Sequence, residues 1–159
     1  MTTRPRRMDD MAAHECAMRA AIAEARGNPV YPFGAVIVCT ATGEIVARGV
    51  NNGRVSPILH GEVVAMNDYV ARRGNTDWSA HTLYTTGEPC GMCMGALIWA
   101  RIGGVVFGSS ISEIERTGID QIAISARSVI DASPFYHGTL LGGVLRAETD
   151  QLFQRRQRS

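Results

Sequence analysis

Apolar segments with helical spacing alternate along this chain with short apolar runs rich in β-branched residues. In residues 8–26 the apolar side chains Met11, Met18 and Ile22 recur near the period of an α-helix, and a Gly-Asn-Pro string ends the segment. The run GAVIVC is typical of a buried strand, and a TATG turn leads from it into EIVARGV, which predicts a hairpin. The expected elements are, in chain order, a helix over 8–26, strands over 34–39 and 44–50, a helix over 60–73, a strand over 82–86, a helix from Pro89 to about Arg101, a strand over 104–109, a strand near 138–144 and a helix from about Leu145.

This order predicts one α/β domain over residues 1–159 with a mixed sheet. The hairpin comes first, and the later strands are joined through helices and are therefore expected to be parallel. In such a βαβ arrangement consecutive helices start at the same edge of the sheet. The residues that open the helices near 60 and 90 should therefore lie side by side. Between Ser110 and Pro134 the pattern is mixed and predicts no single element.

Composition and charge narrow the class of protein. Hydrophobic residues make up 45% of the 159 residues and charged residues 19%, the balance of a folded globular chain. A net charge of +1 provides no broad positive field for nucleic acid or an acidic membrane, and no apolar run approaches the roughly 18 residues that span a bilayer. Arginines gather at the two ends, so residues 1–7 and 154–159 are expected to be flexible basic tails, with phosphate-binding arms as the alternative. No apolar signal segment follows the first arginines, and we expect a cytoplasmic protein with reduced thiols.

Two cysteines three residues apart raise three possible chemistries. Cys90 and Cys93 follow Pro89 and share one face of the predicted helix start, so they suit a redox pair, a structural metal site or an active site. A third ligand decides between these, and His60 opens the preceding helix with Glu62 beside it. Either residue alone is more typical of a helix cap or of dipole decoration. Together, three ligands of N and S type leave one tetrahedral position open, which is typical of catalytic zinc.

The other two cysteines have a simpler interpretation. Cys16 falls in the first predicted helix and Cys39 at the end of a buried strand, where packing is the expected role.

The motifs HGE at 60–62 and EPCGMC at 88–93 resemble the H-x-E and P-C-x-x-C pair of the zinc-dependent nucleoside and nucleobase deaminases, the cytidine deaminase superfamily. The similarity extends over roughly residues 30–110. It implies a three-layer α/β/α sandwich around a mixed five-stranded sheet, one zinc ion per chain and a homodimer. The implied zinc ligands are His60, Cys90 and Cys93.

The resemblance also implies roles for residues around the metal. Glu62 would take a proton from the zinc-activated water and deliver it to the ring and to the leaving amine. Four candidates remain for substrate contacts, namely Asn51, Phe33, the backbone at Gly61, and Asp120. For Asn51 and Asp120 the alternative is an ordinary turn residue, and for Phe33 it is a core residue.

The choice of substrate is left open by the sequence. PFGAVIV and ALIWAR resemble bacterial guanine deaminases, LHGE resembles fungal cytosine deaminase, and EPC with the basic end LFQRRQRS resembles tRNA adenosine deaminases. Family guanine deaminases bring a carboxylate into the site from a C-terminal segment, for which Asp120 is the candidate unless Gln121 takes its place. The remaining arginines are dispersed and the chain contains no lysine, which disfavours a phosphate-lined groove. We therefore predict a hydrolytic deaminase of a free nucleobase or small nucleoside, guanine- or cytosine-type, with a tRNA-specific adenosine deaminase and a non-catalytic zinc module as alternatives.

Overall fold

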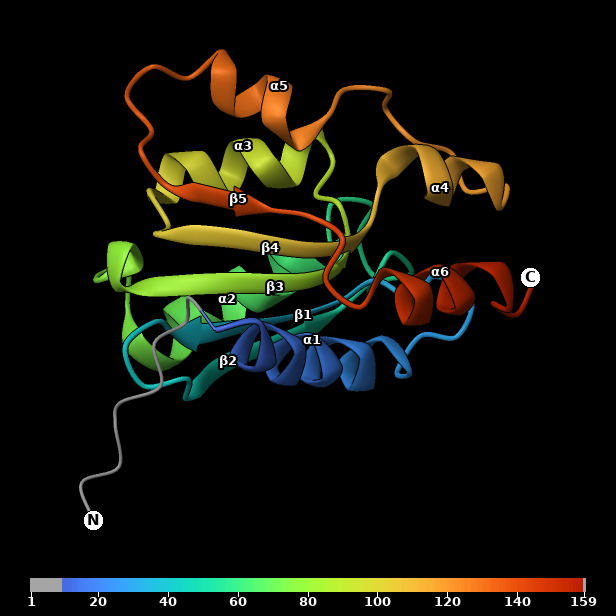
Figure 1. The fold of residues 1–159 in the computed structure, drawn as a ribbon, viewed down its shortest axis with the longest axis horizontal. Coiled ribbons are helices and arrows are strands. Elements are labelled where there is room, and N and C mark those ends of the chain that lie inside the picture. Colours follow the sequence, from blue (N-terminus) through green and yellow to red (C-terminus); the bar gives the residue numbers. More distant parts are fainter. Residues whose placement is uncertain (1–9, 159) are drawn as a thin grey trace.

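Five strands form one sheet between two layers of helices in the computed structural model, which describes residues 10–158 (Figure 1). The order across the sheet is β2-β1-β3-β4-β5. The strands are β1 (Gly34–Cys39), β2 (Ile45–Val50), β3 (His81–Gly87), β4 (Gly104–Ser109) and β5 (Thr139–Leu141). The helices are α1 (Met11–Ala25), α2 (Gly61–Arg73), the short 3-10 helix η1 (Trp78–Ala80), α3 (Gly91–Ala100), α4 (Ile111–Arg116), α5 (Ala126–Asp131) and α6 (Arg146–Gln154).

The direction of the strands confirms the mixed sheet expected from the sequence. Strand β1 pairs antiparallel with both β2 and β3, whereas β3 with β4 and β4 with β5 are parallel. Because β2 and β3 both oppose β1, they run in the same direction, and β2-α2-β3-α3-β4 forms two successive crossovers. Both α2 and α3 therefore begin at the carboxyl edge of the sheet.

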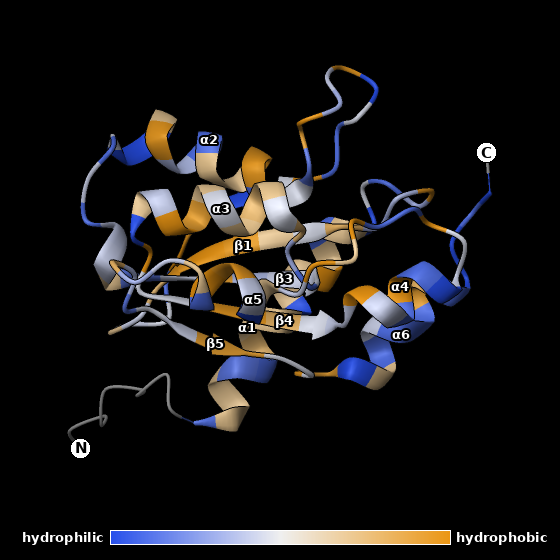
Figure 2. Ribbon diagram, turned by 90° about the horizontal axis from the view of Figure 1, so that it is seen from above, coloured by the Kyte–Doolittle hydropathy of each residue, from blue (hydrophilic) through white to orange (hydrophobic). Residues whose placement is uncertain are grey.

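The helices cover both faces of the sheet, as in the predicted three-layer sandwich. Helices α2, α3 and α5 lie over one face, and α1 and α6 lie against the other (Figures 1 and 2). In β1, Ile37 packs in the cluster that contains Leu97 of α3, whereas its neighbour Val36 packs in the cluster that contains Met18 of α1. Successive side chains of a strand point to opposite faces, so a strand covered on both sides is apolar throughout. This is why β1 is a continuous apolar run.

Some boundaries differ from those predicted. Pro89 was expected in the first turn of α3, but it lies just before the N-cap, Cys90, and so outside the helix. The mixed stretch after Ser110 holds two helices of six residues, α4 and α5, whose N-caps Ser110 and Ser125 each accept a backbone N–H. Helices this short contain too few apolar positions to reveal a period. The strand expected near 138–144 is also shorter, with three residues in β5.

Strand β2 forms one edge of the sheet, and its exposed backbone is partly covered. The N–H of Arg48 donates to Oδ2 of Asp68 on α2 at 3.0 Å, and Nε of Arg72 donates to the same carboxylate. A side chain thus occupies a donor that an edge strand would otherwise present to another chain.

Residues 154–158 lie against the body of the domain, whereas a flexible basic tail was expected over 154–159. Gln154 ends α6, Gln157 donates its backbone N–H to the carbonyl of Pro29 at 2.9 Å, and Arg156 donates to the carbonyl of Val30 at 3.2 Å. The tail expected over 1–7 lies outside the described residues. Within residues 10–158, no helix has the length and apolar character needed to span a bilayer.

Candidate active site

Two helix N-termini meet at the carboxyl edge of the sheet and bring three metal-binding side chains together. His60 is the N-cap of α2, Cys90 is the N-cap of α3, and Cys93 is the third residue of α3; neither N-cap side chain caps its own helix. Nδ1 of His60 lies 3.5 Å from Sγ of Cys90 and 3.6 Å from Sγ of Cys93. The three atoms all lie within 4.8 Å of one another. The geometry agrees with the cluster predicted from the motifs.

This cluster fits zinc in donor type and in spacing. Tetrahedral zinc with Zn–N of about 2.0 Å and Zn–S of about 2.3 Å requires N···S separations of about 3.5 Å. The two distances from the His60 nitrogen match this requirement, and both cysteines are free thiols rather than a disulfide. One nitrogen and two sulfur ligands fill three positions and leave the fourth open.

The cluster is electrostatically prepared for a cation. Hydrogen bonds from Cys93 and from His60 lower the pKa of the Cys90 thiol to about 4, although burial opposes this shift. The Cys90 sulfur in turn raises the pKa of Cys93, and its hydrogen bond raises the pKa of His60. Zinc binds cysteine as the thiolate, so a metal ion that binds here releases the protons that remain on the two thiols.

Glu62 lies buried beside this cluster, in the first turn of α2. Its side chain is 3% exposed, and Oγ1 of Thr85 on β3 donates to its Oε1 at 2.8 Å. Burial raises the pKa of Glu62 above the ordinary value of a glutamate. A carboxyl group fixed in this way next to an open metal position is suited to accept and return a proton.

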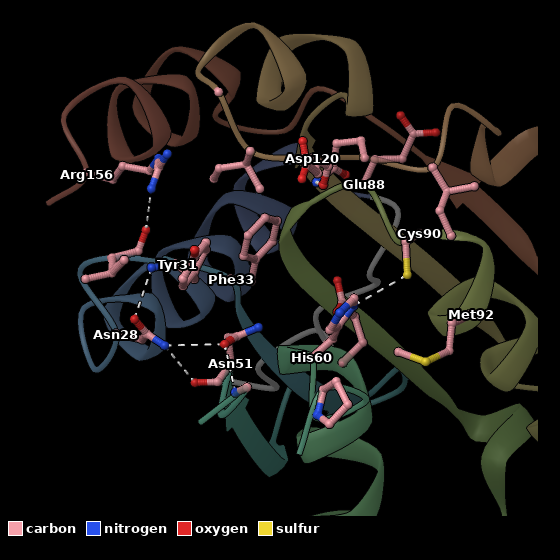
Figure 3. Close-up of a pocket in the computed structure, with 18 of the residues that line it drawn as sticks. Asn28, Tyr31, Phe33, Asn51, His60, Glu88, Cys90, Met92, Asp120 and Arg156 are labelled. Atoms are coloured by element: carbon pink, nitrogen blue, oxygen red, sulfur yellow. Dashed lines mark hydrogen bonds between the residues drawn. The ribbon is translucent and has the colours of Figure 1, made fainter. Parts of the chain in front are cut away.

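A cavity of about 840 Å³ opens from the metal-binding cluster toward the C-terminal segment. Figure 3 shows His60 and Cys90 on one side of it, Asn28, Tyr31 and Arg156 on the other, and Phe33 and Asn51 between them. The lining residues are Asn28, Val30, Tyr31, Phe33, Asn51, Gly53, Arg54, Pro57, His60, Glu62, Glu88, Cys90, Met92, Gly118, Ile119, Asp120, Gln121, Ile122 and Arg156. This volume falls within the range of about 300–1,000 Å³ typical of small-molecule sites.

Phe33 and Gly61 meet where the chain enters β1. The ring of Phe33 is half-buried, packs against Phe153 with centroids 4.9 Å apart and also lines the cavity. A Cβ at Gly61 would lie 2.3 Å from the carbonyl oxygen of Phe33. Glycine is therefore required for the start of α2 to approach this strand so closely.

Asn51 is held by its oxygen rather than by its nitrogen. Its Oδ1 accepts the backbone N–H of Gly53 at 3.1 Å and a longer contact from Nδ2 of Asn28 at 3.4 Å. Its amide nitrogen points toward the middle of the cavity (Figure 3). The residue therefore forms a local turn and also lines the cavity, and its contact with a substrate stays a prediction.

Asp120 and its neighbour Gln121 both line the cavity, on the segment that links α4 to α5. Asp120 is exposed, and its carbonyl accepts a hydrogen bond from the Gln121 side chain at 2.8 Å. The predicted residue, Asp120, and the alternative, Gln121, therefore lie at the same cavity.

Arg156, Tyr31 and Glu88 are among the cavity residues that were not predicted from the sequence, and their signals were weak. Arg156 was assigned to a tail, Tyr31 stands alone among turn residues, and Glu88 belongs to the quoted EPC motif but received no role. Nη1 of Arg156 donates to a backbone carbonyl, and its guanidinium lies 5.7 Å from the centre of the Tyr31 ring. Among residues 10–158 the buried Nε of Arg156 finds no acceptor.

Comparison with known proteins agrees with this geometry. The family profile of the cytidine and deoxycytidylate deaminase zinc-binding region matches residues 11–109. The chain is 37% identical to a guanine deaminase of Bacillus subtilis over 115 residues, which cover 69% of this chain and 72% of that protein. It is 44% identical to a tRNA-specific adenosine deaminase of Streptococcus pyogenes over 81 residues, half of each chain. The solved guanine deaminase of Nitrosomonas europaea superposes with a TM-score of 0.76 at 26% identity, covering 88% of this chain and 82% of that one.

Proposed function

Since the chain belongs to the zinc-binding family of cytidine and deoxycytidylate deaminases, we propose that it deaminates a free nucleobase, with guanine as the first candidate. The enzyme is a zinc hydrolase that acts on a C–N bond. The observation that carries the proposal is the zinc-type cluster of His60, Cys90 and Cys93 with the buried Glu62 beside it, facing a cavity of about 840 Å³. The relative that is similar over the larger share of this chain is named a guanine deaminase.

The reaction replaces an exocyclic amine by a carbonyl oxygen and releases ammonia. Zinc held by His60, Cys90 and Cys93 would supply a bound water of lowered pKa. Glu62 would accept one proton from the attacking water and pass it to a ring nitrogen. It would then take the second proton from the hydroxyl added to the ring carbon and deliver it to the amine, which leaves as ammonia while the C–O bond becomes a carbonyl. The raised pKa of Glu62 helps this exchange, because a carboxyl that releases its proton nearer neutral pH serves both as acceptor and as donor.

The base is held by groups that line the cavity between its two sides. Phe33 presents part of its ring as an apolar face, and the amide nitrogen of Asn51 points inward as a donor (Figure 3). First-turn N–H groups of α2 and α3 have no intrahelical acceptor, so the backbone at Gly61 is available to a polar ring atom. Asp120 supplies a carboxylate that accepts from ring N–H or amino groups.

Ammonia release from free guanine, cytosine and adenine, from their nucleosides and from a tRNA tests this proposal. We expect release from a free base, guanine first. Glu62→Gln should keep one zinc per chain and lose about 10²- to 10⁴-fold in turnover. No release from any free base or nucleoside would overturn the proposal.

The tRNA arm decides the second candidate. An RNA-editing role is favoured by the 44% identity to the streptococcal tRNA-specific adenosine deaminase and by the arginines that end the chain. Deamination of tRNA by the wild-type enzyme, with none of the free bases or nucleosides reacting, would establish that alternative.

A second copy of this chain is the partner that we propose for the exposed end of α3. Trp99 is 78% exposed and stacks on Phe135 with centroids 5.4 Å apart, which leaves a broad aromatic surface in solvent. Light scattering at micromolar concentration should give a dimer mass, and Trp99→Glu should give a monomer. Val70→Glu, at another exposed apolar position, is the matched control, and a monomeric wild-type protein would rule the dimer out.

The cytoplasm is the compartment that we propose. The metal ligands include two thiols that must stay reduced, and all four cysteines are free.

A further inference from the structure

Glu88 is a buried carboxylate whose two oxygens bind two different parts of the chain. The residue is 9% exposed and stands two positions before the metal ligand Cys90. Its Oε1 accepts the N–H of Ile111 at 3.0 Å, and its Oε2 accepts the N–H of Ala126 at 2.8 Å. Its own N–H donates to the carbonyl of Ser109 at 2.8 Å, which fixes its backbone to the end of β4.

The two donors are the first residues of α4 and α5. The N-cap serines of these helices accept N–H groups further along the first turn, that of Glu113 at 3.2 Å and that of Ser128 at 3.1 Å. Glu88 therefore supplies the second acceptor at each helix start. A negative charge is also favourable at a helix N-terminus, so one side chain stabilises both helices.

The segment between these two attachment points forms part of the cavity wall. Residues 118–122 line the cavity. Ile119 packs with Ile114 and Phe153, whereas Ile122 is 57% exposed and Ile124 is 49% exposed. Beyond Ile119 the wall is mostly exposed, so the starts of the two helices that flank it, α4 and α5, help to fix its position, and Glu88 binds both of them.

We propose that Glu88 is a positioning residue that holds the 118–122 wall in register with the metal ligands. Its backbone lies in the turn that carries Cys90, and its side chain accepts the hydrogen bonds that help to fix the wall. A substrate ring placed against the wall is thereby placed against the metal centre. This inference rests on the proposed function, because it concerns how the same cavity holds its substrate.

Glu88→Gln is the decisive variant, because it keeps the size of the side chain. A glutamine has one acceptor oxygen, and its NH₂ group must then face one of the two backbone N–H donors. We expect wild-type zinc content, a rise in KM of about tenfold or more and a much smaller change in kcat. Glu113→Gln is the matched control, since it removes another carboxylate from the first turn of α4, one that pairs with Arg116 and does not bind the start of α5.

The same link can be cut from its other side. Ala126→Pro removes the N–H that Oε2 accepts, and proline is compatible with the first position of a helix after an extended residue such as Ser125. This variant should raise KM as Glu88→Gln does, and it decides the matter if Glu88→Gln fails to fold. A KM within twofold of wild type in folded, zinc-loaded Glu88→Gln overturns the proposal. If that variant does not fold, the same result in Ala126→Pro overturns it. A loss of activity that follows loss of zinc alone also overturns it.

Hydrogen exchange separates this inference from the proposed function. In Glu88→Gln the amides of residues 117–126 should exchange faster than in wild type, whereas those of the first turn of α3 should be unchanged. This result does not depend on which base reacts. An enzyme inactive on every base but with this exchange pattern would refute the proposed substrate and retain the role of Glu88.

Discussion

The two sides of the cavity are built in different ways. The metal side consists of helix starts seated on the central strands, and Glu62, the acid–base group that we propose, is 3% exposed and hydrogen-bonded to β3. The opposite side consists of connecting segments and the end of the chain, where Tyr31 is 41% exposed and Arg156 is tied to the loop by one hydrogen bond. Helices on a packed sheet hold distances closely, whereas such segments move and vary more readily. Under the proposed function, the core would therefore fix the reacting groups and the peripheral segments would select the substrate.

Removal of a ligand on the metal side should have the largest effect. Cys93→Ala leaves two ligands, so we expect zinc to fall well below one per chain and turnover to fall by about three orders of magnitude or more. Metal analysis and ammonia release measure both. Cys16→Ala on the exposed face of α1 is the control and should match wild type in both. Full zinc in Cys93→Ala would remove this residue from the ligand set.

A methyl group added at the junction of the two sides should have an intermediate effect. In Gly61→Ala the new Cβ would meet the Phe33 carbonyl at 2.3 Å, so the start of α2 and the loop before β1 must separate. We expect a loss of about 1–3 kcal/mol in the free energy of unfolding, measured by denaturant titration. Gly95→Ala, in α3 with nothing within 4 Å of the new Cβ, should instead stabilise by about 0.5–1 kcal/mol. Equal effects of the two changes would show that the close approach carries no strain.

A change on the outer side should have the smallest effect and a different kinetic form. Arg156→Gln weakens the contact with Tyr31 and Val30. The outer side of the cavity should therefore loosen, while the metal side is unchanged. We expect KM to rise about three- to tenfold with kcat nearly unchanged. Arg155→Gln, at the exposed neighbouring position, should leave both constants as in wild type. A fall in kcat without a change in KM would show that the two sides are not independent.

The metal side could be predicted from the sequence because local rules act on it directly. His60 and Cys90 stand where turn residues give way to helical pattern, and the order of strands and helices brings the two helix starts to one edge. Cys93 follows Cys90 at helical spacing. Each of these inferences needs only a few neighbouring residues and the rule for parallel crossovers.

The outer side could not be predicted in the same way, because its contacts join distant parts of the chain. Arg156 reaches Val30 across 126 positions, and nothing in a run of terminal arginines distinguishes the one that folds back. Glu88 acts through backbone N–H groups, which every residue but proline offers, so its partners leave no mark in the sequence. The short helices α4 and α5 contain too few apolar positions to show a helical period in the sequence.

The carboxylate of Asp68 at the edge strand β2 affects how copies of the enzyme can associate. A strand of a neighbouring chain could pair with β2 at this point only if Asp68 left the Arg48 N–H. The other edge, β5, offers only three residues to such a partner. Pairing between the edge strands of neighbouring molecules, which can build fibres, is therefore disfavoured at both edges of the sheet. A crowded solution of this protein should accordingly resist fibre formation through its edge strands.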